Sequence, residues 1–469
     1  MSPEVVVGLD AGTTSTKFVA VDSSGSIVAE SSSGDISVSV SDSGGAEQDS
    51  AEIWEAVVAA CRSGVAQLEA ATTVVGLALA SQSGSVVPMT THGPASVVTW
   101  MDRRSESLVD GWDAETKAMV RRESGWTLEP GLGLATIAWF GVGHPQAAFS
   151  RWAAVDDWLM WRFTGSWLTN PSNAAGTQLT EVESGRWSPT LCDLAGVEPD
   201  VLSQIVDSGT IAGALGTEVA GDLLMAGGTP VVVGGHDQTC GALALGAVEP
   251  GAVILSLGTA WVITAVCGPT RVVDVPAGFN LSPHVIDRIW TTSRNLGGLG
   301  AVIASALPAP GSPQRAGPGD VAVRALGDGF FIPDLARTGG EWGTFHGEVG
   351  DESARFAAVI EACAFEVRIA IEEAGDIGRG TGLTVVGGGT RSPGVTQSLA
   401  DVLGRRVIIR PDASWPAIGA ARLAALASGW DVDPGASLPA LEVEPRPDQT
   451  AILDDRFEQY LKMRTEEFS

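Results

Sequence analysis

The sequence predicts an α/β protein made of two similar halves. Apolar runs that suit strands alternate with segments of helical periodicity, so strands and helices share one layered core. The opening pattern of apolar run, Gly-rich turn and apolar run (5–22) returns at 251–266, which indicates a duplicated domain. Because 469 residues exceed what one core usually covers, we expect two domains, 1–247 and 248–469.

In the first half, "VVVGLD", "KFVAVD" and "IVAES" predict an antiparallel meander over residues 5–31. Apolar residues at helical spacing predict a helix over 51–70, with Asp49 or Ser50 as its cap. Strands are expected at 74–81 and 95–100, and the Trp-rich region 110–215 is expected to be mostly helical.

In the second half, a long apolar-periodic segment predicts a helix over 353–375, and "LTVVGGG" (383–389) predicts a strand that runs into three glycines. Two further helices are expected at 392–404 and 416–429, the second closed by Gly429. Pro250 and Gly251 interrupt the pattern between the halves, so we place the boundary near 245–250.

The composition excludes several classes of partner. The net charge of −28 argues against nucleic acid and anionic membranes, which require a cationic surface. No apolar run reaches the roughly 18 residues of a membrane span. Five scattered cysteines without a CxxC pair indicate reduced thiols rather than a metal site, and the first residues lack an export signal, so we expect a cytoplasmic protein.

The opening turn, "GLDAGTTSTK", is a candidate phosphate site. Its consecutive backbone N–H groups and the hydroxyls of Thr13, Thr14 and Ser15 could surround a phosphate, although the spacing is not that of a P-loop. Asp10 would hold Mg²⁺ directly or through water, and Lys17, one of only three lysines, would offset phosphate charge. The alternative is an ordinary hairpin with polar turn residues.

The segment "TPVVVGGHDQTCGALALG" (229–246) carries a candidate catalytic acid. A buried strand ends here and a helix follows, which is where open α/β sheets bind ligands. Asp237 could be a general base and Gln238 could orient a hydroxyl, but an Asp at such a position is more commonly only a helix cap. We interpret His236 as structural.

Glycine-rich segments of the second half offer further ligand contacts. In "LSLGTAW", Gly258 permits close approach and Thr259 supplies a hydroxyl, as in the first turn. "NLGGLG" with Gly298, and "VVGGGTRSPG" with Gly388 and Gly389, could lay bare backbone against a ribose or base. Neither contains a dinucleotide-binding GxGxxG fingerprint.

Taken in order, these segments resemble the FGGY carbohydrate kinases, within the actin-like ATPase superfamily, from residue 4 to about 430. The resemblance rests on "GLDAGTTSTK", "EQDSAEIWEA", "TWMDRRS", "TGSWLTNPSNAAGT", "VVGGHDQTCGALALGAVEPG", "LSLGTA", "VVGGGTRSPGVTQSLADVLGRRV" and "AIGAARLA". It implies two ribonuclease H-like domains facing a cleft, and ATP- and Mg²⁺-dependent phosphorylation of a sugar or polyol hydroxyl.

The resemblance also implies roles for single residues. Asp237 matches the family's catalytic base and Asp10 its metal-associated acid. The first phosphate segment corresponds to Thr13, Thr14 and Lys17, the second to Thr259, and the adenosine segment to Gly388 and Gly389; Gly298 resembles a further nucleotide contact. "TWMDRRS" places Trp100, Asp102 and Arg103 near the sugar pocket, where the alternative is a structural Trp and a surface ion pair.

The acceptor is left open by departures from the family pattern. Xylulokinases carry Gln-x-His-Gly where this chain has "SQSGSVV", so Gly84, next to Ser83, stands in place of a sugar-contacting His. A ketopentose such as xylulose is the first candidate, followed by ribulose, gluconate or a polyol such as erythritol or glycerol. An actin- or chaperone-like ATP switch is the alternative from another class, and a homodimer is compatible with the sequence.

Overall fold

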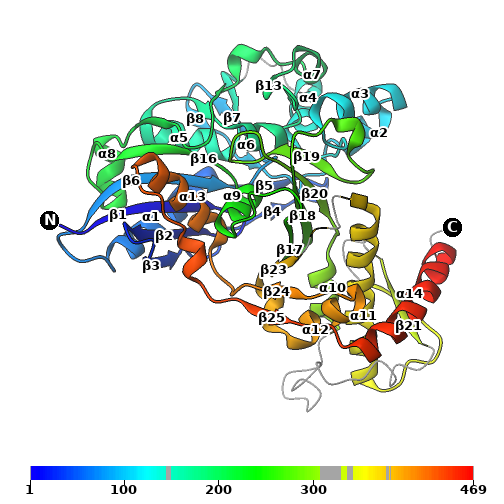
Figure 1. Ribbon diagram of the computed structural model, residues 1–469. Helices are drawn as coiled ribbons and strands as arrows, with labels where there is room; N and C mark the ends of the chain where they lie inside the picture. Colours follow the sequence, from blue (N-terminus) through cyan, green and yellow to red (C-terminus); the bar gives the residue numbers. More distant parts are fainter. Residues whose placement is uncertain are drawn as a thin grey trace.

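Two mixed β-sheets, one in each half of the chain, form the frame of the molecule (Figure 1). The computed structural model describes residues 2–143, 149–306, 329–334, 342–376, 380 and 382–467. The first sheet has the order β15-β16-β6-β1-β2-β3 and contains β1 (Glu4–Ala11), β2 (Thr16–Asp22), β3 (Ile27–Ser32), β6 (Thr73–Ser81), β15 (Ile211–Ala214) and β16 (Pro230–His236). The meander predicted at 5–31 is therefore confirmed.

The second sheet repeats this arrangement. Its order is β19-β20-β18-β17-β23-β24-β25, from β17 (Val253–Leu257), β18 (Trp261–Cys267), β19 (Asn280–Pro283), β20 (Trp290–Asn295), β23 (Leu383–Val386), β24 (Val407–Ile409) and β25 (Leu441–Val443). In both sheets the first strand pairs antiparallel with the second and parallel with a later one, β6 or β23. The predicted duplication is confirmed at the level of strand topology.

Side chains of β1 alternate between two apolar layers. Val5, Val7 and Leu9 face a core shared with α1 (Ser50–Val65), α5 (Val155–Thr164) and α8 (Thr217–Leu223). Val6 faces the other way, into a core shared with α9 (Asp237–Ala244) and α13 (Trp415–Ala427). This period of two is what a central strand buried on both faces requires.

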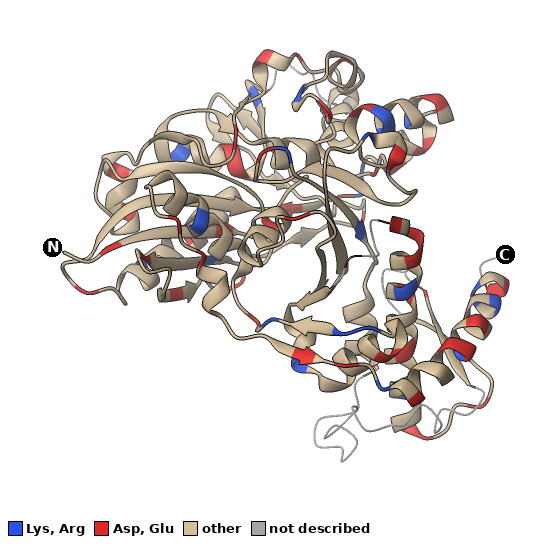
Figure 2. Cartoon of the chain, viewed as in Figure 1, with Lys and Arg blue, Asp and Glu red and all other residues tan. Residues whose placement is uncertain are grey.

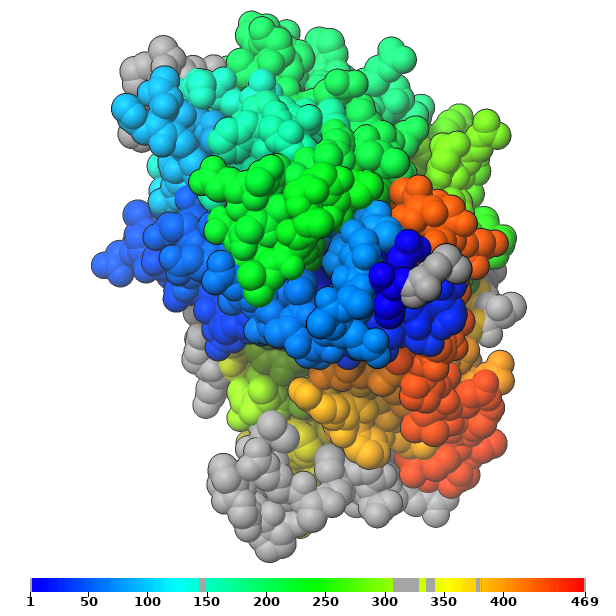
Figure 3. Space-filling view, turned by 90° about the vertical axis from the view of Figure 1, so that its left-hand side faces the viewer, coloured from blue at the N-terminus to red at the C-terminus, as the bar shows by residue number. Residues whose placement is uncertain are grey.

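Helices α9 and α13 form a layer that both halves share. Ile254, Val266 and Val386 of the second sheet belong to the same apolar cluster as these helices. The other face of the second sheet packs on α10 (Leu299–Ser305), α11 (Glu352–Glu373), α12 (Pro393–Leu403) and α14 (Pro447–Glu467). Helix α13 comes from the second half of the sequence yet lies on the first sheet, and Figure 3 shows orange atoms of this part of the chain against blue atoms of the first half.

Glycines allow this close packing. A Cβ on Gly8 would lie 1.9 Å from the carbonyl oxygen of Ala417 in α13, and one on Gly419 would lie 1.9 Å from the carbonyl oxygen of Cys240 in α9. These helices therefore approach β1 and each other at backbone distance.

The region between β6 and β15 departs from the predicted layers. The expected strand at 95–100 is only β9 (Val97–Val98), which pairs with β5 (Ala46–Gln48) in a small separate sheet with β4 (Ser39–Val40), because turns take up residues 99–104. Helices dominate 110–215 only in part, since short strands interleave with them. The α-helices between β6 and β15 are α2 (Glu106–Gly111), α3 (Ala114–Ser124), α4 (Gly133–Gly143), α5, α6 (Pro171–Gly176) and α7 (Pro189–Ala195). The strands are β7 (Val87–Thr90), β8 (Gly93–Pro94), β10 (Arg151–Ala153), β11 (Leu168–Thr169), β12 (Thr180–Glu181), β13 (Arg186–Trp187) and β14 (Gln204–Ile205), with β9 as described above.

Helix ends also differ from expectation. The helix predicted over 51–70 ends at Val65, because Gln67 and Leu68 donate backbone hydrogen bonds three residues back, in tighter turns than an α-helix has. The second half also contains the hairpin of β21 (Phe330–Pro333) and β22 (Gly343–His346). Acidic residues are spread over both halves (Figure 2), and within the described ranges no helix is both long and apolar enough to cross a membrane.

Candidate active site

Three parallel strands end side by side at one edge of the first sheet. In register, Asp10 of β1 lies beside Ala80 of β6, and His236 of β16 lies beside Ser81 of β6. Asp10, the segment after Ser81, and Asp237 at the start of α9 therefore gather at this edge. The sequence-predicted acid and base are brought together by strand register, as expected for the carboxyl ends of parallel strands.

Asp10 is a buried acid in a charged neighbourhood. It is 4% exposed, and its Oδ1 accepts no hydrogen bond from the residues that the structure describes. Burial raises the pKa of Asp10 to about 7, the charge of Asp237 adds to this rise, and Lys17, whose Nζ lies 3.9 Å from Oδ2, lowers it. An oxygen left without a donor beside a second carboxylate fits a Mg²⁺ site completed by water and phosphate.

Asp237 begins α9 and remains partly accessible. Its side chain is 25% exposed, and its Oδ1 lies 3.0 Å from Nε2 of His236. The backbone N–H of His236 donates to Ser172 Oγ of α6, at 2.9 Å. His236, which we interpreted from the sequence as only structural, is thus the direct neighbour of the predicted base. Gln238 follows in the first turn of α9 and is half-buried.

Two glutamine side chains form hydrogen bonds to Thr13 in the opening turn between β1 and β2. Gln48 donates to the carbonyl oxygen of Thr13 at 2.7 Å, and Gln82 accepts from the Thr13 hydroxyl at 3.0 Å. The Thr13 hydroxyl proton is therefore already used inside the chain, which differs from its predicted role as a phosphate donor. Thr14 is exposed and Ser15 is half-buried, so their side chains stay accessible.

Sequence reasoning missed both glutamines as site residues. Gln48 and Gln82 are buried and joined by a hydrogen bond of 3.2 Å. Gln48 lies within "EQDSAEIWEA", and Gln82 directly precedes Ser83. The only sequence signal for a site role was therefore that each is a polar residue in or beside a segment already recognised, because neither belongs to a motif of its own.

The predicted sugar-pocket residues have different surroundings. Trp100 is 39% exposed, and its Nε1 donates to Thr13 Oγ1 at 3.2 Å. Asp102 is buried, and both its oxygens accept hydrogen bonds from backbone or side-chain donors of Ala46 and Arg104. Arg103 pairs with Glu106 on the surface. The contacts of Asp102 and Arg103 favour a structural role over hydroxyl recognition.

In the second half, the predicted glycine segments converge at the ends of β17 and β23. A Cβ on Gly300, in the first turn of α10, would lie 2.0 Å from the carbonyl oxygen of Gly258. Ala301 donates its backbone N–H to Thr259 at 3.2 Å, and a Cβ on Gly389 would lie 2.7 Å from Leu257 Cβ. Gly258, Thr259, Gly298 and the Gly388–Gly389 segment thus form one patch of accessible backbone.

A cavity of about 470 Å³ lies beside this patch. It is lined by aromatic and apolar side chains, among them Phe331, Trp342 and Phe345, with Arg355 at its wall. A Cβ on Gly298 would lie 3.2 Å from the Trp342 ring, so one residue of the cavity wall also packs against the predicted nucleotide contact. Sequence reasoning did not identify Trp342, because it stands in no recognised segment.

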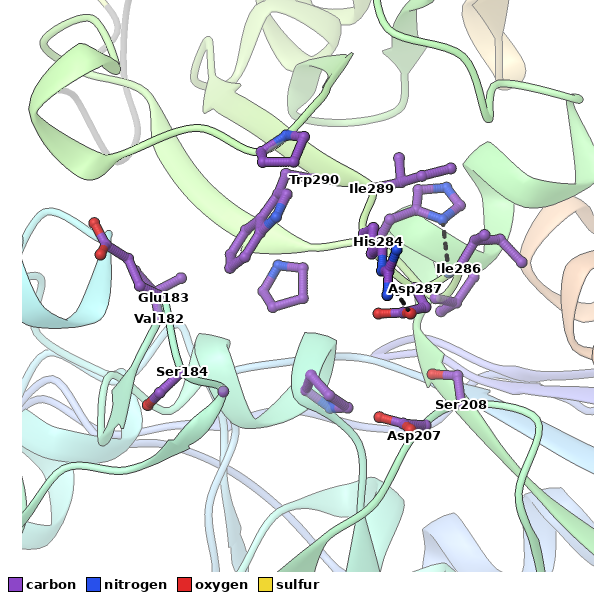
Figure 4. Close-up of a pocket in the computed structure, with 16 residues that line it drawn as sticks. Val182, Glu183, Ser184, Asp207, Ser208, His284, Ile286, Asp287, Ile289 and Trp290 are labelled. Carbon is purple, nitrogen blue, oxygen red and sulfur yellow. Dashed lines mark hydrogen bonds and ion pairs between the residues drawn. The ribbon is translucent and has the colours of Figure 1, made fainter.

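A separate cavity of about 430 Å³ lies at the seam between the halves (Figure 4). Glu183, Ser184, Asp207 and Ser208 line it from the first half, and the loop 283–290 lines it from the second, with Trp290 on one side. Val285 of this loop packs on Gly235, where a Cβ would lie 2.2 Å from Val285 Cγ1. The loop therefore supports the strand that ends before Asp237.

Known proteins share both the sequence pattern and the fold. Residues 5–244 match the N-terminal domain of the FGGY family of carbohydrate kinases, and residues 319–428 match the C-terminal domain. The chain is 31% identical to an autoinducer-2 kinase of Photorhabdus laumondii over 295 residues (61% of this chain, 55% of that protein) and 28% identical to an apulose kinase of Pectobacterium atrosepticum over 460 residues (92% and 91%).

The solved structures include a xylulose kinase of Lactobacillus acidophilus, with a TM-score of 0.88 and 21% identity over 99% of this chain and 100% of that one. This likeness confirms the fold class of two actin-like ATPase domains. The aligned region spans only about half the length of the autoinducer-2 kinases. Since the two domain models together cover most of the chain, the protein belongs to the FGGY family of carbohydrate kinases.

Proposed function

We propose that the protein transfers the γ-phosphoryl group of ATP to a hydroxyl of a sugar or polyol, with Asp237 as the general base. The observation that carries this proposal is the placement of Asp237. Its carboxylate is partly exposed, it stands at the strand edge that also presents Asp10, and it directly follows β16, whose last residue pairs with Ser81. Family membership supports the same reaction class.

In the proposed reaction an Asp237 oxygen accepts the proton of the acceptor hydroxyl as the alcohol oxygen bonds to the γ-phosphorus. The bond from that phosphorus to the oxygen bridging to the β-phosphorus breaks, and ADP leaves. Phosphoryl transfer depends mainly on positioning and charge neutralisation, so one carboxylate is enough to handle the proton. Water has to be kept away because it competes as acceptor.

The remaining residues would position the triphosphate. Backbone N–H groups of residues 12–15 and the Lys17 ammonium would face phosphate oxygens from the first half, and the Gly258–Thr259 turn would do so from the second. The aromatic cavity beside Gly298 would take the base, and Gly388 and Gly389 would border the ribose. Asp10 would hold Mg²⁺, which supplies positive charge to the phosphates when bound.

For the acceptor, we propose a ketopentose such as D-xylulose, with ribulose, gluconate and polyols as alternatives. The fold match to a xylulose kinase supports the class, while the curated relatives named for autoinducer-2 and apulose keep the acceptor wider than one sugar. The division into domains 1–247 and 248–469 and a homodimeric state remain predictions.

The deciding experiment is a screen of ADP release with MgATP across pentuloses, hexuloses, aldonates and polyols, repeated with Asp237→Ala. We expect acceptor-dependent ADP release by the native chain and its loss in the variant, with MgADP affinity retained. Acceptor-dependent turnover that survives the substitution would refute the assigned base. ADP release that no acceptor stimulates would favour an ATP switch instead.

A further inference from the structure

Asp237 presents its two carboxylate oxygens to different surroundings. Its side chain as a whole is 25% exposed, yet Oδ1 is buried and accepts no hydrogen bond from the residues that the structure describes. The exposed part of the carboxylate is therefore Oδ2. Nε2 of His236 lies 3.0 Å from Oδ1, so a small rotation of either side chain would complete a hydrogen bond. Because a buried carboxylate oxygen without a donor is costly, His236 is well placed to supply one.

The backbone of His236 is fixed on two sides. His236 is the last residue of β16 and pairs in register with Ser81 of β6. Its backbone N–H donates to Ser172 Oγ of α6 at 2.9 Å, and the Ser172 hydroxyl donates to Asn170 Oδ1 at 2.6 Å. The side chain of His236 is 15% exposed, so the ring is mostly enclosed. The imidazole therefore reaches Asp237 from a fixed backbone position.

The chain of hydrogen bonds behind His236 continues to a buried acid. Asn170 Nδ2 donates to Asp156 Oδ2 at 3.4 Å, and Thr169 Oγ1 donates to the same oxygen at 2.7 Å. Asp156 is 5% exposed. Burial raises the pKa of Asp156 to about 6, and the Thr169 hydroxyl and the charge of His236 act in the opposite direction. Asp156 and His236 thus lie close enough to attract each other, which helps to anchor the ring.

The proposed base also needs support against a second acid. The charge of Asp237 raises the pKa of Asp10, which means that the two carboxylates repel each other. Asp237 stands on the first turn of α9, where its side chain could rotate to relieve this repulsion. Such a rotation would carry Oδ2 away from the acceptor, and a misplacement of about 1 Å can cost about 10²-fold in rate. A donor that holds Oδ1 opposes the rotation.

Resting on the proposed kinase function, we propose that His236 is the positioning residue of the base: its Nε2–H holds Oδ1 of Asp237, so that Oδ2 faces the acceptor hydroxyl. The acceptor proton passes to Oδ2 while the alcohol oxygen bonds to the γ-phosphorus, as in the reaction above. His236 neither exchanges a proton nor touches the acceptor. The neutral ring with its proton on Nε2 and the protonated ring both offer this donor, so the role does not depend on the charge of His236.

The test compares two variants of equal side-chain length. His236→Gln keeps an N–H donor at about the reach of Nε2, whereas His236→Met has a similar size and no donor. With MgATP and the best acceptor of the screen, kcat of His236→Gln should stay within a few-fold of the native value, and kcat of His236→Met should fall roughly 10- to 100-fold. KM for the acceptor and the affinity for MgADP should change little in both, because the contact acts on proton transfer. His92→Met, on an exposed turn, is the control and should leave kcat unchanged.

A double-mutant cycle tests whether His236 acts through Asp237. In the Asp237→Asn background, His236→Met should change the residual kcat by less than about threefold, because the carboxylate that His236 positions is already gone. An equal loss in both backgrounds would overturn the proposal, and so would an equal loss in His236→Gln and His236→Met. A raised KM for the acceptor with unchanged kcat in His236→Met would make His236 a direct acceptor contact, which also contradicts the proposal.

The outcomes separate this inference from the proposed function. Native kcat in a folded His236→Met protein overturns the role of His236 alone. If thermal unfolding shows that His236→Met does not fold, His236→Asn takes its place, because its shorter side chain cannot bring a donor to the position of Nε2 and the same loss of kcat is expected. Absence of acceptor-dependent ADP release by the native chain would overturn the proposed function together with this inference.

Discussion

Asp10 of β1 and Asp237 of α9 lie close enough at the edge of the first sheet for the charge of Asp237 to raise the pKa of Asp10. Burial raises the pKa of the Cys240 thiol, one helical turn after Asp237, and the charges of Asp10 and Asp237 raise it further. Two carboxylates and a buried thiol in one place are costly unless a cation or a proton compensates them. We therefore expect the stability of the site to depend on pH, and the proposed Mg²⁺ to relieve the same repulsion.

The first prediction is that Asp10 weakens the fold at neutral and alkaline pH. Burial raises its pKa from the ordinary 3.8 to about 7 in the folded chain. Between these values the unfolded chain releases the proton while the folded chain keeps it, so this residue's contribution to stability is present below pH 3.8 and is lost as pH rises toward 7. Asp10→Asn should therefore raise the free energy of unfolding at pH 8, on the order of 2 kcal/mol.

Urea unfolding at several pH values, with EDTA present, measures this effect. The gain from Asp10→Asn should grow between pH 4 and pH 8, whereas the exposed Asp42→Asn should show no such trend. A gain independent of pH would mean that the substitution acts through packing. Added MgADP should stabilise the native chain more than the Asp10→Asn variant, because the variant lacks the proposed metal ligand.

The second prediction concerns Asp237. Asp237→Asn keeps the shape of the side chain but cannot accept a proton, so kcat with the best acceptor should fall by about 10²–10⁴. Calorimetric binding of MgADP should remain within a few-fold, since Asp237 faces the acceptor in the proposed reaction. Asp200→Asn, in the short 3₁₀-helix Pro199–Val201 and exposed, serves as the matched control. A small change in kcat would assign the proton to another group.

The third prediction concerns the lysine beside Asp10. Lys17 is 40% exposed and lies next to the turn proposed to bind phosphate. Lys17→Met removes its charge, so KM for MgATP should rise roughly tenfold or more while KM for the acceptor changes little. Lys117→Met on α3 removes one charge far from these strands and should leave both constants unchanged. An equal effect of the two variants would point to net charge instead.

Patterns local in sequence predicted most of the fold. Apolar runs located β1, β2, β3, β6, β16, β17, β18 and β23, and helical periodicity located α11, α12 and α13 to within a few residues. The outer strands β15, β19, β20, β24 and β25 were not predicted. The end of α1 and the short β9 were wrong, because turns at Gln67 and after Val98 override the apolar pattern. The sequence did not predict that α13 packs on the sheet of the first half. Gly8 and Gly419 make that close packing possible, but their role is visible only once β1, α9 and α13 are placed in space.

The position of a site residue was predictable where the residue ends a strand. Its role was less predictable where that role depends on hydrogen-bond partners from distant parts of the sequence. Asp10 and Asp237 follow apolar runs, so strand register alone brings them together. The predicted role of Asp102 as a hydroxyl reader finds no support in its contacts, because Arg104 and Ala46 reach it through a turn that no periodicity encodes. Gln48 and Gln82 are far apart in sequence, and only the fold joins them.

The last prediction tests whether the α9–α13 layer must meet β1 at backbone distance. In Gly8→Ala the new methyl would lie 1.9 Å from Ala417 O and 2.4 Å from Ala421 N, both backbone atoms that cannot move alone. Helix α13 would have to shift, so the free energy of unfolding should fall by more than about 2 kcal/mol. Gly221→Ala, inside α8 with open space around it, should be neutral or stabilise by up to about 1 kcal/mol. Since α9 begins with Asp237 and packs on α13, any folded Gly8→Ala protein should also lose kcat, and unchanged stability and turnover would show that this contact does not position the base.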